Sequence, residues 1–277
     1  GAELRYTLDD SEPTATSTLY AGTFQLATNT LGNRTILRVA GFKGGYVVSS
    51  TVSQAYVFEV ATPTMSIAGG NFVNDTNVTI TTVTSGATLR FTTDGSDPTE
   101  SSAVWSNGPF GIDGLLRVRA FRDGFLPSGI VASQFNFTVA SPTIATAGGT
   151  FNNGITVTIN NGATTGAELR YTLDGSDPTS SSTLYEGAFA LATNVLAGKT
   201  TVAVAGFKAN YKTSATQTRD YVFKVATPTV SVAGGSFINN TNVTVSTVTT
   251  GATIRFTTDG LEPTTSSLPW VNGSYGT

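Results

Sequence analysis

The sequence predicts an all-β chain of tandem antiparallel β-sandwich domains, and three observations carry this prediction. Thr and Gly are abundant, with 30 glycines in 277 residues, a usage typical of short strands joined by tight turns. Apolar residues alternate with polar ones in many short runs, which marks strands with one buried face. One string of residues also recurs four times, so repeats rather than one large domain build the fold.

Composition excludes several classes of protein. Hydrophobic residues make up 39% and charged residues 12% of the chain, which is typical of a globular protein rather than a disordered one. The absence of Cys and His excludes disulfides, triads with a His base and the usual zinc sites. The net charge is −3 and the basic residues are scattered singly, so we expect no nucleic-acid partner. No apolar stretch reaches about 18 residues, so we expect no membrane insertion in this segment.

The recurring string defines two alternating types of domain. GAELRYTLDD begins at Gly1 and returns as GAELRYTLDG at Gly166, while GATLRFTTDG begins at Gly86 and GATIRFTTDG at Gly251. Because each type returns only after the other, the positions predict a super-repeat of about 165 residues. Most positions of the segment 1–112 are identical to the matching positions of 166–277, which indicates tandem duplication.

A second recurring string marks the boundaries. It reads ATPTMSIAGG at Ala61, ASPTIATAGG at Ala140 and ATPTVSVAGG at Ala226. We therefore predict a C-terminal part of a domain at 1–60, complete domains at 61–139 and 140–225, and an N-terminal part at 226–277. These segments are called the first to fourth repeats. Both end segments contain the recurring strand, at LRYT from Leu4 and IRFT from Ile254, so they cannot complete each other. We therefore expect the chain to be part of a longer array of repeats.

The strands within each repeat alternate with a period of two. Leu116 and Val118 face one way while Arg117 and Arg119 face the other. About seven such strands fit in one repeat, and this density of strands favours two packed antiparallel sheets.

One motif resembles a known domain. The segments FTTDGSDPTESSAVW at Phe91 and YTLDGSDPTSSSTLY at Tyr171, with VAVAGF at Val202 and YVFKV at Tyr221, resemble the small Ig-like domain at the C-terminal end of chitobiases and β-hexosaminidases. The resemblance implies an Ig-like, fibronectin III-like sandwich that acts as an accessory or spacer module and catalyses nothing. Asp10 replaces the motif glycine in the first copy, so its left-handed turn is in question.

The recurrent carboxylates have two interpretations. Asp94 with Asp97, and Asp174 with Asp177, are oxygen-rich pairs that resemble part of a Ca²⁺ shell. Asp-Gly followed by Asp-Pro is also a turn signature, in which the carboxylate accepts hydrogen bonds from the backbone. Glu12 and Glu262 stand in for the second Asp in the other copies, which suits a turn better than a metal shell. We therefore assign no catalytic, cofactor or metal residues and predict that the chain is not an enzyme.

Aromatic residues after the Ser-Ser pair offer a surface for sugars. Trp105 and Trp270 match Tyr20 and Tyr185 in the other repeats. Their fixed place favours an aromatic that covers one end of the core, with carbohydrate binding as the alternative.

Two covalent modifications have sequence signals to weigh. Sequons of the Asn-x-Ser/Thr kind are glycosylation candidates at Asn33, Asn74, Asn77, Asn136, Asn239, Asn242 and Asn272. An isopeptide cross-link through Lys224 is not supported, because the matching residue is Glu59.

The expected function is therefore mechanical. Each strand-final Val runs directly into Ala-Thr-Pro or Ala-Ser-Pro without a flexible linker, so neighbouring domains should be coupled semi-rigidly. We predict a structural repeat region of an extracellular or cell-surface protein that forms a rod, stalk or filament. Its expected partner is another copy of the chain, through Thr-rich strands such as that at Thr79, or surface glycans. The alternative is a carbohydrate-binding or spacer region of a secreted polysaccharide-degrading enzyme or adhesin.

Overall fold

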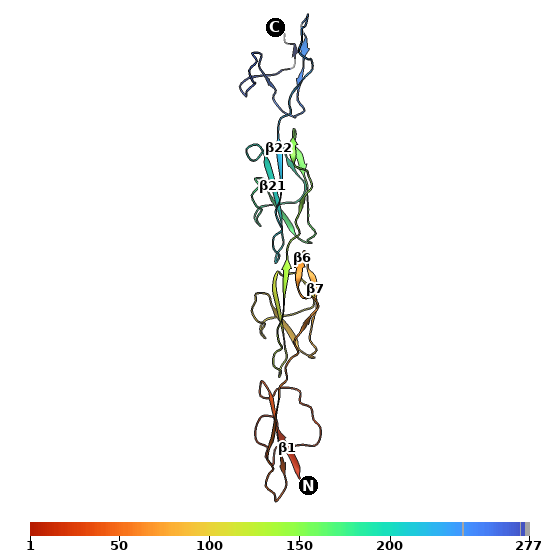
Figure 1. Cartoon of the computed structure of the whole chain (residues 1–277), viewed down its shortest axis with the longest axis vertical. Helices are drawn as coiled ribbons and strands as arrows, with labels where there is room; N and C mark the ends of the chain where they lie inside the picture. Colours follow the sequence, from red (N-terminus) through yellow and green to blue (C-terminus); the bar gives the residue numbers. More distant parts are fainter. Residues whose placement is uncertain (240, 272, 275–277) are drawn as a thin grey trace. The chain divides into compact units, whose positions relative to one another are not determined.

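The computed structural model describes residues 1–239, 241–271 and 273–274. These residues form strands and loops and contain no helix (Figure 1). They therefore include no helix that could cross a membrane. The chain divides into two compact units, Gly1–Thr138 with Asn210–Lys212, and Val139–Ala209 with Thr213–Thr277. This division is coarser than the four predicted repeats, whose boundaries stay a prediction.

The first repeat is a single four-stranded antiparallel sheet. Its strands lie in the order β2-β1-β3-β4, with bounds Glu3–Thr7 for β1, Thr18–Leu19 for β2, Thr35–Phe42 for β3 and Val52–Tyr56 for β4. Strand β3 is the most buried, with Thr35, Ile36 and Ala40 shielded from solvent, while all of β4 is exposed.

The second repeat is a sandwich of one large sheet and two small ones. The five-stranded sheet has the order β10-β9-β12-β13-β6, and the opposite layer consists of the pairs β5–β8 and β7–β11. The bounds are Thr64–Met65 for β5, Gly70–Phe72 for β6, Thr76–Val78 for β7, Ile80–Thr81 for β8, Thr88–Thr92 for β9, Ala103–Val104 for β10, Gly108–Phe110 for β11, Gly114–Phe121 for β12 and Val131–Phe137 for β13.

Strands of both layers contribute to one core. Val78, Leu116, Val118 and Phe135 have no exposed surface and belong to one apolar cluster. The predicted alternation is confirmed, because Arg117 and its outward neighbours on β12 stay partly exposed. All pairings in the large sheet are antiparallel except that of β6 with β13, which is parallel.

The third repeat has the same architecture. Its large sheet has the order β15-β22-β21-β18-β19, and the pairs β14–β17 and β16–β20 form the other layer. The bounds are Thr143–Ile144 for β14, Gly149–Phe151 for β15, Ile155–Val157 for β16, Ile159–Asn160 for β17, Glu168–Thr172 for β18, Thr183–Leu184 for β19, Phe189–Leu191 for β20, Thr200–Phe207 for β21 and Gln217–Phe223 for β22. A second apolar cluster, centred on Val202, Val204 and Tyr221, fills this sandwich.

The fourth repeat contains three pairs of short strands. They are β23–β25, β24–β28 and β26–β27, with bounds Thr229–Val230 for β23, Asn242–Val243 for β24, Val245–Ser246 for β25, Arg255–Phe256 for β26, Leu268–Pro269 for β27 and Gly273–Ser274 for β28. An open apolar cavity of 460 Å³, lined by residues such as Val230, Phe256 and Trp270, lies between the pairs.

Candidate functional site

The end of the first repeat is fixed by a side-chain clamp. Asn29, which is 7% exposed, donates from Nδ2 to the carbonyl of Phe58 over 2.8 Å. Its Oδ1 accepts the Phe58 N–H over 2.9 Å. One amide side chain therefore satisfies both backbone groups of the residue that leads out of the repeat.

A loop of the second repeat docks on this clamped segment, inside the first unit. The Leu126 N–H donates to the Phe58 carbonyl over 2.8 Å, and the Val60 N–H donates to the Leu126 carbonyl over 2.9 Å. The Gly124 carbonyl accepts the Asn29 N–H over 2.6 Å. The rings of Phe58 and Phe125 lie 5.7 Å apart, so backbone hydrogen bonds and an aromatic contact both hold this junction.

Close approach at this junction needs a glycine. Gly124 has a φ of 75°, and a Cβ on it would lie 2.8 Å from Thr28 Cβ. The Ala61 N–H, the first of the second repeat, is held by Thr84 Oγ1 over 2.9 Å. At this junction the last residues of the first repeat and the first residue of the second repeat are all hydrogen-bonded to neighbouring parts of the two repeats.

The second unit has a related junction between the third and fourth repeats. Asn153 donates from Nδ2 to the Val248 carbonyl over 2.9 Å, and its Oδ1 accepts the Thr250 N–H over 2.7 Å. The Ala226 N–H is held by Thr249 Oγ1 over 2.8 Å, which matches the bond between Ala61 and Thr84.

The aspartate turns carry local hydrogen bonds. Asp94 Oδ1 accepts the backbone N–H of Ser96 over 2.9 Å and its hydroxyl over 2.6 Å. Asp174 makes the same two bonds to Ser176, over 3.0 and 2.6 Å. The hydroxyl bond from the serine is the main cause that lowers the pKa of Asp94 and Asp174 below the ordinary value. These are the contacts of a turn, and the described residues contain no group of three acidic side chains placed to hold a metal.

The structure separates the second aspartate of the motif from the first. Asp97 forms an ion pair with Arg117 of β12, so it reaches across the strands instead of sharing a ligand with Asp94. The two recurrent carboxylates therefore have different partners.

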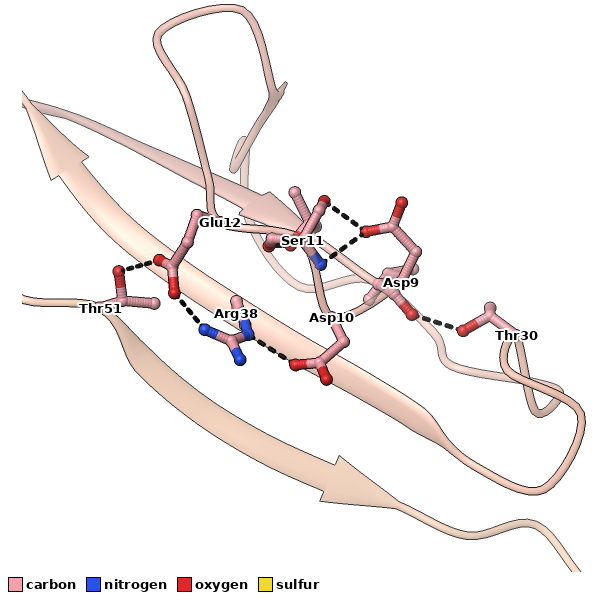
Figure 2. Close-up of polar contacts among 9 residues, drawn as sticks. Asp9, Asp10, Ser11, Glu12, Thr30, Arg38 and Thr51 are labelled. Carbon is pink, nitrogen blue, oxygen red and sulfur yellow. Dashed lines mark hydrogen bonds and ion pairs between the residues drawn. The ribbon is translucent and has the colours of Figure 1, made fainter.

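The turn that lacks glycine keeps its geometry. Asp10 has a φ of 64°, in the left-handed region that Gly95 and Gly175 also adopt. The Asp10 carboxylate accepts from Arg38 Nε over 2.7 Å, and Arg38 also pairs with Glu12, which in turn accepts from Thr51 (Figure 2). The hydrogen bond that Arg38 donates to Asp10 raises the pKa of Arg38. Asp10 therefore replaces a glycine and adds a link to β3.

The aromatic residues after the Ser-Ser pair pack on other rings. Trp105 meets Phe91 edge to face at 5.4 Å, and its Nε1 donates to Asn107 Oδ1 over 2.8 Å. Trp270 and Phe256 repeat this pair at 5.3 Å. These contacts agree with the core interpretation.

The two tyrosines at this position differ from each other. Tyr185 is partly buried against the third-repeat core, and its hydroxyl oxygen accepts the Ile159 N–H over 2.9 Å. Tyr20 is 43% exposed and meets Phe24 at its edge.

The sequons differ in exposure. Asn136 is partly buried and its Nδ2 donates to Asn71 Oδ1 over 3.1 Å, and Asn74 is partly buried too. The sequon asparagines exposed to solvent are Asn33, Asn77, Asn239 and Asn242, while Asn272 lies outside the described residues. Their glycosylation stays a prediction.

The clamp and the docking loop were not predicted from the sequence. Asn29 and Asn194 occupy matching positions of the first and third repeats, in the strings LATNT and LATNV. An aromatic also follows the long strand of each of the first three repeats, at Tyr46, Phe125 and Tyr211. These recurrences were a usable signal, although nothing in them says which backbone groups the side chains meet.

One family model matches most of the chain. It is described as the chitobiase/beta-hexosaminidase C-terminal domain, and it matches residues 67–133, 146–218 and 232–274. The chain belongs to this family. Residues 1–56 match the model described as Fn3 associated. The chitobiase/beta-hexosaminidase C-terminal domains of this chain have the predicted fold, an Ig-like, fibronectin III-like sandwich.

The chain is also similar to solved structures of fibronectin(III)-like modules and of immunoglobulin and other extracellular domains. The fibronectin(III)-like modules of Clostridium thermocellum CbhA are 16% identical, with 59% of this chain and 94% of that chain covered and a TM-score of 0.24. Sidekick-1 immunoglobulin domains 1–5 are 9% identical, with 81% and 52% covered and a TM-score of 0.27. Drosophila OTK extracellular domains 3–5 are 10% identical, with 82% and 86% covered and a TM-score of 0.24. No curated protein matches the chain.

Proposed function

We propose that the chain is a non-catalytic structural region of an extracellular or cell-surface protein, in which successive sandwiches form a semi-rigid array that sets a distance. The junction between Asn29, Phe58 and Phe125 carries the proposal. Four hydrogen bonds hold the segment 58–60, where the first repeat ends. The Asn29 side chain makes two of them and the Leu126 backbone makes the other two. A flexible linker would leave these backbone groups to water.

The chemistry of the described residues also supports a structural role. The recurrent carboxylates are used in turns or ion pairs. The aromatic residues Trp105 and Trp270 pack against neighbouring rings. Repetition of units that bury their own interiors is typical of proteins that span a distance.

Spin-label distances test the stiffness of the junction. The chain has no Cys, so Gln25→Cys with Val83→Cys places one label on each of the first two repeats. Both positions are exposed. We expect a narrow distance distribution in the parent chain and a broad one after Phe125→Ala. A parent distribution as broad as that of the variant would contradict the proposal.

The first repeat offers a matched control. Tyr46 occupies the loop position in the first repeat that Phe125 occupies in the second. Its N–H donates to the carbonyl of Lys43, as that of Phe125 donates to Arg122. Its side chain is 68% exposed. Tyr46→Ala should leave the distance distribution unchanged, because Tyr46 does not contact Phe58. Labelling of intact cells of the source organism with an antibody against the chain tests the location.

A second candidate function rests on the matched family, whose name ties the domain to chitobiase and β-hexosaminidase. In that case the chain is an accessory region of a secreted polysaccharide-degrading enzyme or adhesin. Pull-down of the full chain by chitin would support this candidate. Self-association through the Thr-rich strands stays a prediction, which sedimentation of the full chain at rising concentration would test.

A further inference from the structure

A polar cavity of 290 Å³ lies at one end of the large sheet in the second repeat. Its lining is Gly86, Thr88, Arg90, Glu100, Phe121, Arg122 and Asp123. Sites for small ligands begin at about 300 Å³, so this cavity suits a group of the size of one sugar ring.

The arginine that matches Arg90 is paired with a glutamate in the first and third repeats, which are of the other type. In the first repeat Arg5 pairs with Glu3 over 2.7 Å, and in the third repeat Arg170 pairs with Glu168 over 2.9 Å. The second repeat has Thr88 in place of this glutamate. Within residues 1–239, 241–271 and 273–274, Arg90 therefore has no carboxylate in ion-pair contact.

A second arginine lies directly across the sheet. Arg119 of β12 is the cross-strand partner of Arg90 on β9, whereas the same register places Ala40 opposite Arg5 and Ala205 opposite Arg170. Like charges directly opposite each other destabilise a sheet. Of the three large sheets that the structure describes, only the sheet of the second repeat has two arginines at these opposing positions.

The remaining contacts of these arginines are to backbone carbonyls and to an aromatic ring. Arg90 Nη1 donates to the Ser102 carbonyl over 2.6 Å, and Arg119 Nε donates to the Ser128 carbonyl over 2.7 Å. The Arg122 guanidinium lies 4.3 Å from the centre of the Phe125 ring. Each guanidinium keeps donors free for an anion.

Two carboxylates limit which anion fits. Glu100 and Asp123 line the same cavity and are exposed. They would repel a multiply charged phosphate or a dense sulfate polymer, but they accept hydrogen bonds from hydroxyl groups. A singly charged carboxylate on a ring with several hydroxyls satisfies both sets of side chains.

We propose that the cavity lined by Arg90 and Arg122 binds a uronic acid unit of an acidic polysaccharide, with the charge of Arg119 nearby on the adjacent strand. The sugar carboxylate accepts from the Arg90 and Arg122 guanidinium groups, and the ring hydroxyls donate to Glu100 and Asp123, which line the same cavity. This site goes beyond the proposed spacer role, because the side chains of Arg90, Glu100 and Asp123 take no part in the junction.

Calorimetric titration of the full chain with trigalacturonate tests the proposal, with neutral galactotriose as the matched ligand that lacks only the carboxylates. We expect heat of binding with the acidic sugar and none with the neutral one. Dextran sulfate serves as a polyanion without the sugar acid. No binding of trigalacturonate at millimolar concentration, equal binding of galactotriose, or tighter binding of dextran sulfate would each overturn the proposal.

Variants separate the site from general charge. Thr88→Glu installs the glutamate that Glu3 and Glu168 provide in the other repeats, so the fold should tolerate it while the affinity falls about tenfold or more. Arg119→Ala installs the alanine found at 40 and 205 and removes the positive charge opposite Arg90, so it should also weaken binding. Thr79→Glu, on an exposed position of the opposite layer, makes the same change of net charge and should leave binding unchanged. Equal losses in Thr88→Glu and Thr79→Glu would show nonspecific attraction and refute the site.

Discussion

Asn194 holds both backbone groups of Phe223 in the third repeat. Its Nδ2 donates to the Phe223 carbonyl over 2.9 Å, and its Oδ1 accepts the Phe223 N–H over 2.8 Å. The second repeat has Asp113 in this role, which accepts the Phe137 N–H over 2.9 Å. A carboxylate has no donor for a carbonyl, so the clamp is bidentate only where the residue is Asn.

Removal of this clamp should destabilise the third repeat. Asn194→Ala leaves two backbone groups of Phe223 without their partner, so we expect a loss of about 1–3 kcal/mol in the free energy of unfolding. Asn194→Asp keeps the acceptor and should show the smaller loss. Native-state hydrogen exchange of the β21 amides measures the effect on this repeat. A change below about 0.5 kcal/mol for Asn194→Ala would show that water replaces the side chain without cost.

Replacing the glycine of the aspartate turn with alanine should destabilise the third repeat more than the second. Gly95 and Gly175 have φ values of 86° and 80°, but a Cβ on Gly95 meets nothing within 4 Å while one on Gly175 lies 3.0 Å from Thr201 Cγ2. Thr201 is fixed by its hydrogen bond to Asp220 over 2.6 Å. We expect Gly95→Ala to cost about 1 kcal/mol through its φ alone, and Gly175→Ala to cost more. Hydrogen exchange of the β12 amides in Gly95→Ala and of the β21 amides in Gly175→Ala measures the two losses of stability. Equal losses would contradict the steric argument.

The local part of this fold could be predicted from sequence. Alternation alone places Leu116 and Val118 inside and Arg117 outside, and the Asp-Gly and Asp-Pro pairs indicate turns at Asp94 and Asp174. Contacts between residues far apart in the chain could not be predicted in this way. The bond between Asn29 and Phe58 spans 29 residues, and Phe125 contacts Phe58 of the preceding repeat.

The pair of arginines beside the cavity of the second repeat was missed for the same reason. Basic residues are scattered singly in the sequence, yet strand register brings Arg90 and Arg119 opposite each other. A sequence shows spacing along one strand, whereas this pair depends on which strands are neighbours and how they are aligned.

The serine of the turn should set the pKa of the aspartate. Ser176 hydrogen bonds are the largest causes that lower the pKa of Asp174. The fourth repeat has Leu261 at this position, which has no hydroxyl, and Asp259 accepts the backbone N–H of Leu261 over 3.1 Å. Ser176→Leu should therefore raise the pKa of Asp174 toward its ordinary value, measured by NMR titration of the side-chain carboxyl.

The same shift has a defined effect on stability. Because the folded-state pKa of Asp174 is lowered, its contribution is present above the unfolded pKa of about 3.9 and is lost as pH falls through the folded value. The parent chain should lose more stability than Ser176→Leu between about pH 5 and the acid limit. Parallel acid-unfolding curves for the two proteins would contradict this assignment.

A buried hydroxyl distinguishes the third core from the second. Tyr221 is fully shielded from solvent and donates to the Thr146 carbonyl over 2.8 Å, whereas Phe135 takes the same place opposite Gly70 that Tyr221 takes opposite Gly149. Tyr221→Phe should cost about 1 kcal/mol, because the Thr146 carbonyl loses its partner. Tyr171→Phe is the matched control, since Tyr171 makes no hydroxyl hydrogen bond within the described residues.

Alkaline pH gives Tyr221 a second, independent readout. Burial raises the pKa of Tyr221 above its ordinary value of 10.0, so the unfolded chain ionises this phenol more readily than the folded one. Stability from this group is complete below about pH 10 and is lost as pH rises above it. Tyr221→Phe removes this dependence of stability on pH, so the stabilities of the parent and the variant should converge as pH rises. Hydrogen exchange of the β21 amides or thermal unfolding measures both stabilities. A constant difference between them from neutral to alkaline pH would mean that the phenol ionises equally in both states and that its hydroxyl is not held in the core.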